Sequence, residues 1–196
     1  MSNQKIKQMT AVALLMALVV VMQFVGGMIP PVGGFSISLV LIPVVLGSAL
    51  YGPGVGALLG GTFGAIVFIN CVTGADPGGA MVFQAGPVLC FVVVMAKGIL
   101  AGLASGSLYK VLKGKNTYIA MLCAAIICPI INTGVFVICM LAFFKDVLNA
   151  WAGGGDLLAY ILTGLVLANF LPEMIINVVF GTVGQRIIHV VKKNEK

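Results

Sequence analysis

Residues 118–144, with the sequence YIAMLCAAIICPIINTGVFVICMLAFF, decide the fold class of this chain. The run contains no charged residue. A helix needs about 20 mostly apolar residues to cross the hydrocarbon core of a lipid bilayer, and this run is longer than that. We therefore expect residues 118–144 to form a transmembrane helix.

The composition of the whole chain agrees with this interpretation. Of its 196 residues, 61% are hydrophobic and 8% are charged, and the mean hydropathy is +1.18. A soluble domain carries about 25% charged residues and needs polar groups to cover its surface. A disordered chain needs low hydrophobicity and high charge. The composition excludes both classes and leaves the bilayer as the solvent.

Five further apolar segments accompany the first: residues 6–26, 36–50, 55–69, 81–109 and 157–191. Two of them are short, and one of these can be irregular where it lines a cavity. The string Tyr51-Gly52-Pro53-Gly54 separates these two and predicts a tight turn. The sequence thus predicts an all-α, polytopic membrane protein, a six-transmembrane-helix bundle that forms one domain over residues 1–196.

The distribution of charge predicts the orientation. With the amino terminus in the cytosol, Asp76, Asp146 and Asp156 fall outside together with Lys145, and Lys97 lies within a helix. Cytosolic segments of membrane proteins carry an excess of Lys and Arg, so both termini are predicted to be cytosolic. The net charge of +6 then needs no nucleic-acid partner. Nine of the eleven Lys and Arg residues are cytosolic in this arrangement: Lys5, Lys7, Lys110, Lys113, Lys115, Arg186, Lys192, Lys193 and Lys196.

The cysteines and the single histidine give no sign of a metal site or cofactor. No two cysteines form a C-x-x-C pair, and all lie in or beside apolar runs. We therefore interpret them as small packing residues. His189 is the only histidine, which excludes a histidine cluster. The five cysteines are Cys71, Cys90, Cys123, Cys128 and Cys139.

Small residues recur at four-residue spacing on three predicted helices. Helix packing in lipid depends on such smooth stripes. Two stripes are glycines, and we expect them to pack helices inside the bundle. The third, Ala13 and Ala17, is either internal packing or a docking face for a partner subunit. The glycine stripes are Gly56, Gly60, Gly64 and Gly98, Gly102, Gly106.

Two ionisable residues, Lys97 and Glu173, lie inside predicted spans, where a charge costs at least about 2.5 kcal/mol and tends to mark function. Asn132 is predicted at a similar depth. Asn169, Glu173 and Asn177 recur every four residues on one helix face, which should face the bundle interior or a wet cavity.

Two interpretations of these residues stay open, and they are compatible. Lys97 and Glu173 can form a structural ion pair that fixes helix register. Alternatively, Lys97, Asn132, Asn169 and Glu173 can line a mid-depth site for a polar solute, with Asn177 on the same helix face. A bound anion would favour Lys97, whereas a donor-rich ligand would favour Glu173 and the asparagines.

Gln84 is a weaker candidate for the site. It shares a helix face with Lys97 only if Gly86-Pro87 bends the helix. Gln84, Asn70 and Trp151 are predicted near the external mouth, where they can line an entrance, although Trp151 can instead anchor the protein at the membrane interface.

Motifs of catalysis are absent from the sequence. There is no G-x-x-x-x-G-K-[ST] phosphate loop, no G-x-S-x-G and no H-E-x-x-H. Glu173 is the single carboxylate predicted in the membrane interior, which disfavours acid–base catalysis by paired carboxylates. We expect a binding or permeation protein and no enzyme.

Several ordered motifs together resemble the substrate-binding S component of energy-coupling factor (ECF) vitamin transporters, over nearly the whole chain. The first helix carries Ala13-Leu14-Leu15-Met16-Ala17. Residues 42–57, IPVVLGSALYGPGVGA, look like the family's proline-containing helix followed by a Gly-Pro turn. The fourth and sixth helices are matched by Lys97-Gly98 with Gly102 and Leu108-Tyr109-Lys110, and by Pro172 with Asn177.

The resemblance implies a mechanism. Such a subunit is a single transmembrane substrate-binding domain in the bacterial plasma membrane, and it captures a water-soluble vitamin or related micronutrient from outside. The Ala13/Ala17 face would meet a transmembrane coupling subunit that sits on two ATPase subunits. ATP turnover would then reorient the binding subunit and release the substrate inside. The one lysine predicted at the site is compatible with an anionic ligand such as pantothenate.

Two other functions remain open from the residues alone. A stand-alone proton-coupled carrier or small channel is motivated by Glu173, since a buried carboxylate can relay protons. A structural or assembly subunit of a membrane complex is permitted by the glycine stripes.

Overall fold

The computed structural model describes residues 3–28 and 39–194, which form helices joined by short connections, with no strand among them. The predicted all-α class is therefore confirmed. The elements are α1 (Asn3–Met28), α2 (Leu41–Tyr51), α3 (Pro53–Thr73), α4 (Pro77–Ala85), α5 (Pro87–Leu112), α6 (Thr117–Phe143), α7 (Lys145–Trp151), α8 (Leu157–Tyr160), the π-helix η1 (Ile161–Phe170) and α9 (Leu171–Asn194).

Five helical stretches of the described chain are long and apolar enough to cross a membrane. A sixth apolar helix, Leu41–Tyr51, is shorter than a usual span. The prediction of a multi-pass helical membrane protein therefore agrees with the structure. The five stretches are Gln4–Gly27, Pro53–Thr73, Pro87–Leu112, Thr117–Phe143 and Leu157–Gly181.

The predicted fourth helix, residues 81–109, is wrong as a single element. It is divided into α4 and α5 at Gly86, whose backbone is extended with φ −171° and ψ 93°. The ring of Pro87 disfavours helical geometry at the preceding residue but suits the first position of a helix. The helix that carries Lys97 therefore begins at Pro87 rather than at Met81.

The turn after α2 forms as predicted. Gly52 has φ +95°, a conformation that favours glycine, and Pro53 begins α3 directly after it. The helix before the turn begins at Leu41 rather than at residue 36, and residues 36–38 lie outside the described part of the chain.

The predicted sixth helix, residues 157–191, is one continuous helical stretch in three parts, two of them α-helical and one π-helical. It opens as α8, continues as η1 and ends as α9. A π-helix has i→i+5 hydrogen bonds and is wider than an α-helix, so it changes the direction in which successive side chains point. The connection before this stretch, residues 145–156, contains the short helix α7.

The two glycine stripes bring α3 and α5 into direct backbone contact, which confirms internal packing. A Cβ atom on Gly60 would overlap the carbonyl oxygen of Gly98, and one on Gly98 would overlap that of Gly60. Gly56 and Gly102 meet in the same reciprocal way. Only glycine permits so close an approach. The contact fixes α5 against α3 along its length and sets the position of Lys97, the neighbour of Gly98.

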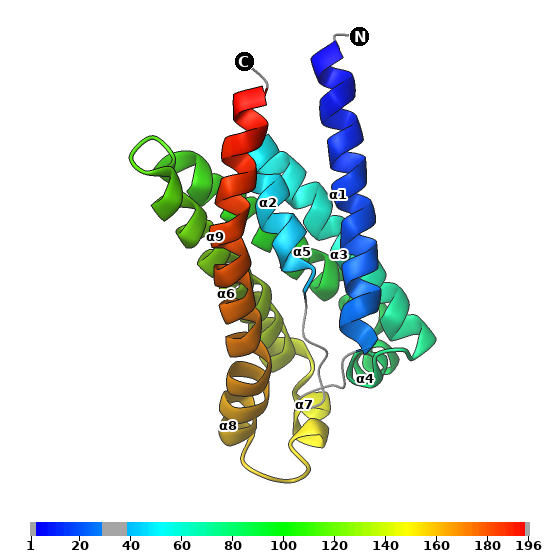
Figure 1. Cartoon of the computed structure of the whole chain (residues 1–196). Coiled ribbons are helices and arrows are strands. Elements are labelled where there is room, and N and C mark those ends of the chain that lie inside the picture. The colour runs from blue at the N-terminus through cyan, green and yellow to red at the C-terminus, as the bar shows by residue number, and fades with distance from the viewer. Residues whose placement is uncertain (1–2, 29–38, 195–196) are drawn as a thin grey trace.

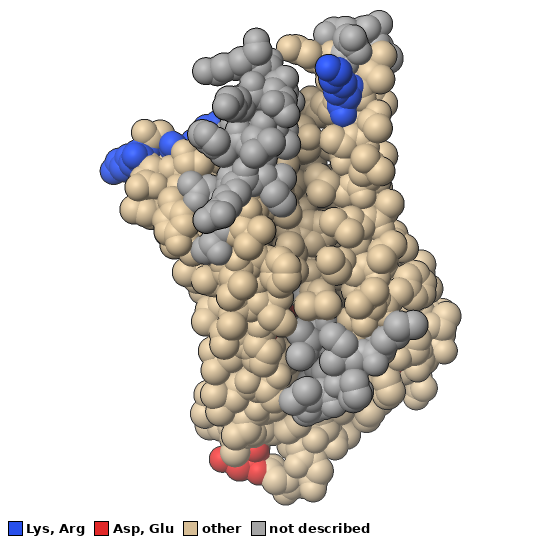
Figure 2. All heavy atoms as spheres, viewed as in Figure 1, with Lys and Arg blue, Asp and Glu red and all other residues tan. Residues whose placement is uncertain are grey.

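The helices are arranged so that α1 begins and α9 ends at one end of the molecule, with α4, α7 and α8 at the opposite end (Figure 1). Lys and Arg atoms gather at the end with the termini, and acidic atoms appear at the other end (Figure 2). Inside, the Ser48 hydroxyl donates to Ser105 Oγ (3.2 Å), and Ser105 donates to the carbonyl of Ala124 (3.1 Å). These buried bonds tie α2, α5 and α6 together.

Candidate functional site

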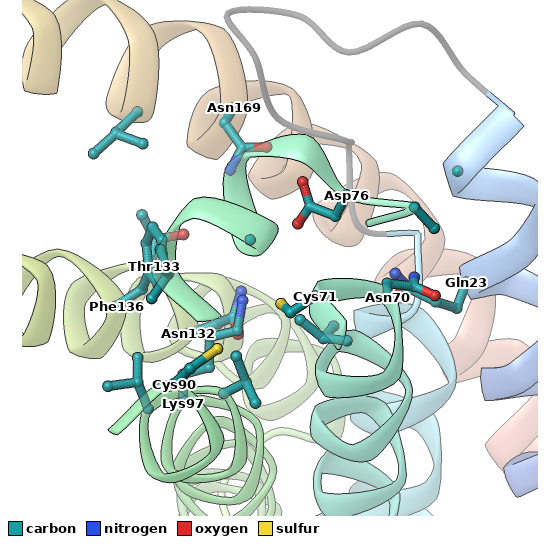
Figure 3. A pocket seen from close by; sticks show the side chains of 18 of the residues that line it. Gln23, Asn70, Cys71, Asp76, Cys90, Lys97, Asn132, Thr133, Phe136 and Asn169 are labelled. Carbon is teal, nitrogen blue, oxygen red and sulfur yellow. The ribbon is translucent and has the colours of Figure 1, made fainter. Parts of the chain in front are cut away.

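A cavity of about 300 Å³ opens among the helices at the end that carries α4 and α7. Its volume lies at the lower limit of ligand pockets, which span about 300–1,000 Å³. Polar side chains from several elements enter it, and Figure 3 shows them around the open space. They include Gln23, Asn70, Asp76, Lys97, Asn132 and Asn169.

Lys97 supplies a cation from the wall that α5 forms. Its ammonium nitrogen lies 5.4 Å from the ring centroid of Phe63 on α3 and 5.0 Å from that of Phe136 on α6. The negative faces of two aromatic rings attract a cation and hold it in place. The lysine side chain is half-buried and lines the cavity, so its charge faces the open space.

Asn132 and Asn169 are two of the amide side chains that line the cavity. Asn132 comes from α6, one turn after Pro129, and Asn169 comes from η1. The Oδ1 atoms of both are buried and accept no hydrogen bond from the described residues. Leaving a buried acceptor without a hydrogen bond costs about 1–3 kcal/mol of stability. A bound molecule with hydrogen-bond donors would satisfy these two acceptors.

Asp76 adds a carboxylate at the amino end of α4. It occupies the N-cap position, yet its side chain makes no cap hydrogen bond and lines the cavity instead. Gly79 leaves room for it, because a Cβ atom at Gly79 would lie 2.8 Å from Asp76 Oδ2 and would overlap Cys71 Sγ. The cavity therefore holds both signs of charge.

Aromatic and sulfur-bearing side chains form part of the cavity wall. Trp151 stacks on Phe136 with 6.5 Å between ring centroids, and both residues line the cavity. Trp151 and Asn70, which the sequence predicts near the external mouth, thus both line the cavity. Cys71 and Cys90 are free cysteines that also line the cavity, in addition to packing α3 against α5.

Three of the six predicted site residues lie together in the cavity, namely Lys97, Asn132 and Asn169. Glu173 and Asn177 are buried on α9 but do not belong to the cavity lining, and Asn177 Nδ2 donates to the Glu173 carbonyl at 2.9 Å. The transition from η1 to α9 falls between Asn169 and Glu173. The four-residue spacing therefore does not place these two side chains on one helix face, as it would in a single α-helix. Gln84 is exposed on α4 and does not line the cavity.

The predicted docking residues lie far from the cavity, on α1. Ala13 and Ala17 are both exposed. Ala13 belongs to a mainly apolar groove between α1 and α3, whose other lining residues include Met16, Val55 and Leu58.

Comparison with known families decides the class of protein. The family model described as "ECF transporter, substrate-specific component" matches residues 7–182. The chain belongs to this family of ECF transporter S components. A search of curated proteins gave no match. This S component is therefore a subunit of a membrane transporter. The family works with the T and ATPase subunits of an ECF module and with a small-molecule substrate, and its members are not enzymes.

Three features of the S component's cavity could not be predicted from the sequence. Asp76 was recognised only as an external charge, although its place just before Pro77 puts it at the start of a helix beside the end of α3. Cys71 and Cys90 were read as packing residues only. Gln23, near the end of α1, gave no signal in the sequence because a lone glutamine late in an apolar helix is uninformative by itself.

Proposed function

We propose that this S component captures a water-soluble vitamin or related micronutrient in the cavity beside Lys97. The substrate would then enter the cell by ATP-driven uptake through a transmembrane coupling subunit and two ATPase subunits. The observation that supports this most is the cavity itself, in which the half-buried Lys97, several amide side chains and a carboxylate lie beside aromatic rings. Such a mixture of apolar surface and a few convergent polar groups is typical of small-molecule sites.

The proposed orientation places the cavity toward the outside of the bacterial plasma membrane. Lys5 and Lys7 on α1, and the lysines around the α5–α6 connection, lie at the opposite end of the molecule (Figure 2). An excess of lysine marks the cytosolic side of a membrane protein. In this arrangement both termini are cytosolic, the short helix α2 completes six crossings, and the chain forms one substrate-binding domain.

Within this site, we assign direct contact with the substrate to Lys97, Asn132 and Asn169. Glu173 and Asn177 are buried one to two turns beyond Asn169 and do not line the cavity, so we assign them a structural role in holding α9 beside it. Gln84 would act at the rim, because it is exposed on α4 close to the start of α5.

Two measurements test the proposed function. First, the purified, detergent-solubilised chain should bind one member of a panel of water-soluble vitamins in isothermal titration calorimetry. Second, liposomes that contain the chain with its coupling and ATPase subunits should accumulate that vitamin only with internal ATP. Uptake by the chain alone, driven by a pH gradient, would contradict the proposal and support a proton-coupled carrier.

A further inference from the structure

The cavity carries two opposite charges, and their positions indicate what kind of molecule fits it. Lys97 enters from α5, and Asp76 enters from the connection between α3 and α4. In Figure 3, Asp76 and Asn169 lie on one side of the open space, whereas Lys97 and Asn132 lie on the other. A molecule between them would meet a cation at one side and a carboxylate at the other.

The two charges also lie at different depths in the bundle. The ammonium group of Lys97 contacts the ring of Phe63, which lies halfway along α3. Asp76 lies beyond the end of α3, which is capped by Gly74 with φ +75°. Two aromatic faces and the electrostatic attraction of the Glu173 and Asp76 carboxylates stabilise this ammonium group, and an anionic group of a ligand that entered the cavity would add to them. The deep end of the cavity is therefore suited to an anionic group.

The carboxylate of Asp76 is available to a ligand because the fold does not use it as a helix cap. An N-cap aspartate usually accepts hydrogen bonds from the first backbone N–H groups of its helix. Asp156 does so at the start of α8, where it accepts from the N–H of Leu158 at 3.0 Å. Asp76 makes no such side-chain bond, although its backbone carbonyl accepts from the N–H of Ala80 at 2.8 Å.

The outer part of the cavity therefore favours hydrogen-bond donors. The amide oxygens of Asn132 and Asn169 are buried, and within the described chain neither has a hydrogen-bond partner. Asn169 lies on the same side of the open space as Asp76, and the two offer acceptors there that N–H or O–H groups of a ligand can satisfy, whereas Asn132 offers its acceptor on the side of Lys97. A positively charged or hydroxyl-bearing group at that position meets these acceptors, whereas a second anionic group would be repelled by Asp76.

We propose that the substrate is a compact dipolar molecule. Its anionic group, such as a carboxylate, binds Lys97, and N–H or O–H donors at its other end bind Asp76 and Asn169, while Asn132 accepts from a donor on the side of Lys97. The inference rests on the proposed function, since it specifies the chemical class of the solute that the same cavity takes. The volume of about 300 Å³ restricts the class to small molecules.

Isothermal titration calorimetry on the purified full-length chain tests this with matched probes. Tryptophan, pantothenate and biotin each combine a carboxylate with donors of different kinds: an ammonium group, hydroxyl groups and ureido N–H groups. Tryptamine, panthenol and biotinamide lack the carboxylate, and indole-3-propionate lacks the ammonium group. Thiamine and riboflavin, which carry no carboxylate, complete the panel.

We expect one of the three dipolar probes to bind at least tenfold more tightly than its partner without the carboxylate. Lys97→Gln should abolish this difference in affinity. Asp76→Asn should weaken the binding of the dipolar probe at least fivefold. Lys145→Gln and Asp146→Asn make the same changes of charge at exposed positions of α7 outside the cavity lining, and they should leave both affinities unchanged. The comparison between probes on the unmodified chain does not depend on any variant folding.

The possible failures are distinguishable. Tight binding of thiamine or riboflavin, or equal affinity for a probe with and without its carboxylate, would overturn the dipolar assignment while supporting vitamin binding. Binding of no probe at all would contradict the proposed function and the dipolar assignment with it.

Discussion

Lys97 is the residue on which the site depends most. Its ammonium group is held by two aromatic rings and faces the cavity. A hydrogen bond to a charged group contributes about 1.5–3 kcal/mol. We therefore predict that Lys97→Gln weakens substrate binding about 10- to 100-fold in calorimetry. Gln84→Ala should have a smaller effect, since Gln84 is exposed on α4.

The same variant separates the two interpretations of Lys97 that the sequence leaves open. If Lys97 serves the ligand, Lys97→Gln removes a charge that faces the cavity and should not lower the thermal stability of the ligand-free protein. Breaking a structural ion pair with Glu173 would instead destabilise the protein by about 3–5 kcal/mol. A large fall in melting temperature together with the loss of binding would therefore favour the ion pair.

Gly79 is a second residue whose small size serves the cavity. A methyl group there would press on Asp76 Oδ2 and Cys71 Sγ, two side-chain atoms that can move. We predict that Gly79→Ala displaces the Asp76 carboxylate and weakens binding several-fold, with little loss of stability. Gly134→Ala is the matched control, because nothing lies within 4 Å of a Cβ atom at that helical position. Unchanged affinity in Gly79→Ala would argue against a role of Asp76 in binding.

At the scale of the elements, the contact between α3 and α5 positions the site. Gly60 and Gly98 meet through their backbones, whereas a Cβ atom on Gly61 would lie 3.6 Å from Ile99 Cγ1, an ordinary contact. We predict that Gly60→Ala separates the helices and lowers stability by about 1–3 kcal/mol, as overpacking does in cores. The neighbouring Gly61→Ala should be nearly neutral. Similar melting temperatures for the two variants in the same detergent would contradict the proposed contact.

The apolar runs were sufficient to predict the helical elements, but not how they are divided. Residues 118–144 correspond closely to α6, since a long uncharged run has few alternatives in lipid. The break at Gly86–Pro87 interrupts a run whose hydropathy is continuous, so hydropathy alone could not find it. The amino-acid composition of the π-helical stretch η1 does not distinguish it from an α-helix, so the sequence could not predict it. Because η1 ends between Asn169 and Glu173, Asn169 does not share the helix face of Glu173 and Asn177.

At the scale of the whole molecule, part of the site could be predicted and part could not. Lys97, Asn132 and Asn169 were found because polar residues in apolar helices are costly and therefore conspicuous. Asp76 lies in a connection, where polar residues are common and carry little signal, and Trp151 was predicted only near the external mouth. Only the three-dimensional arrangement shows that these residues enter the same cavity.

The exposed face of α1 is predicted to contact the coupling subunit. Ala13 and Ala17 are small and exposed, and Ala13 borders the groove between α1 and α3. Ala13→Trp combined with Ala17→Trp should abolish co-purification of the coupling and ATPase subunits but preserve binding of the substrate. Ile138→Trp, at an exposed position of α6, should leave the complex intact. An intact complex in the double variant would contradict the assignment of this face.

The central claim is that the cavity beside Lys97 holds the transported solute. The most direct test is an experimental structure of the chain with the tightest-binding probe. We predict density for the probe between Lys97 and Asp76, with its anionic group within hydrogen-bond distance of Lys97 Nζ. A probe bound elsewhere, with Lys97 paired to Glu173 and the cavity closed, would contradict the account.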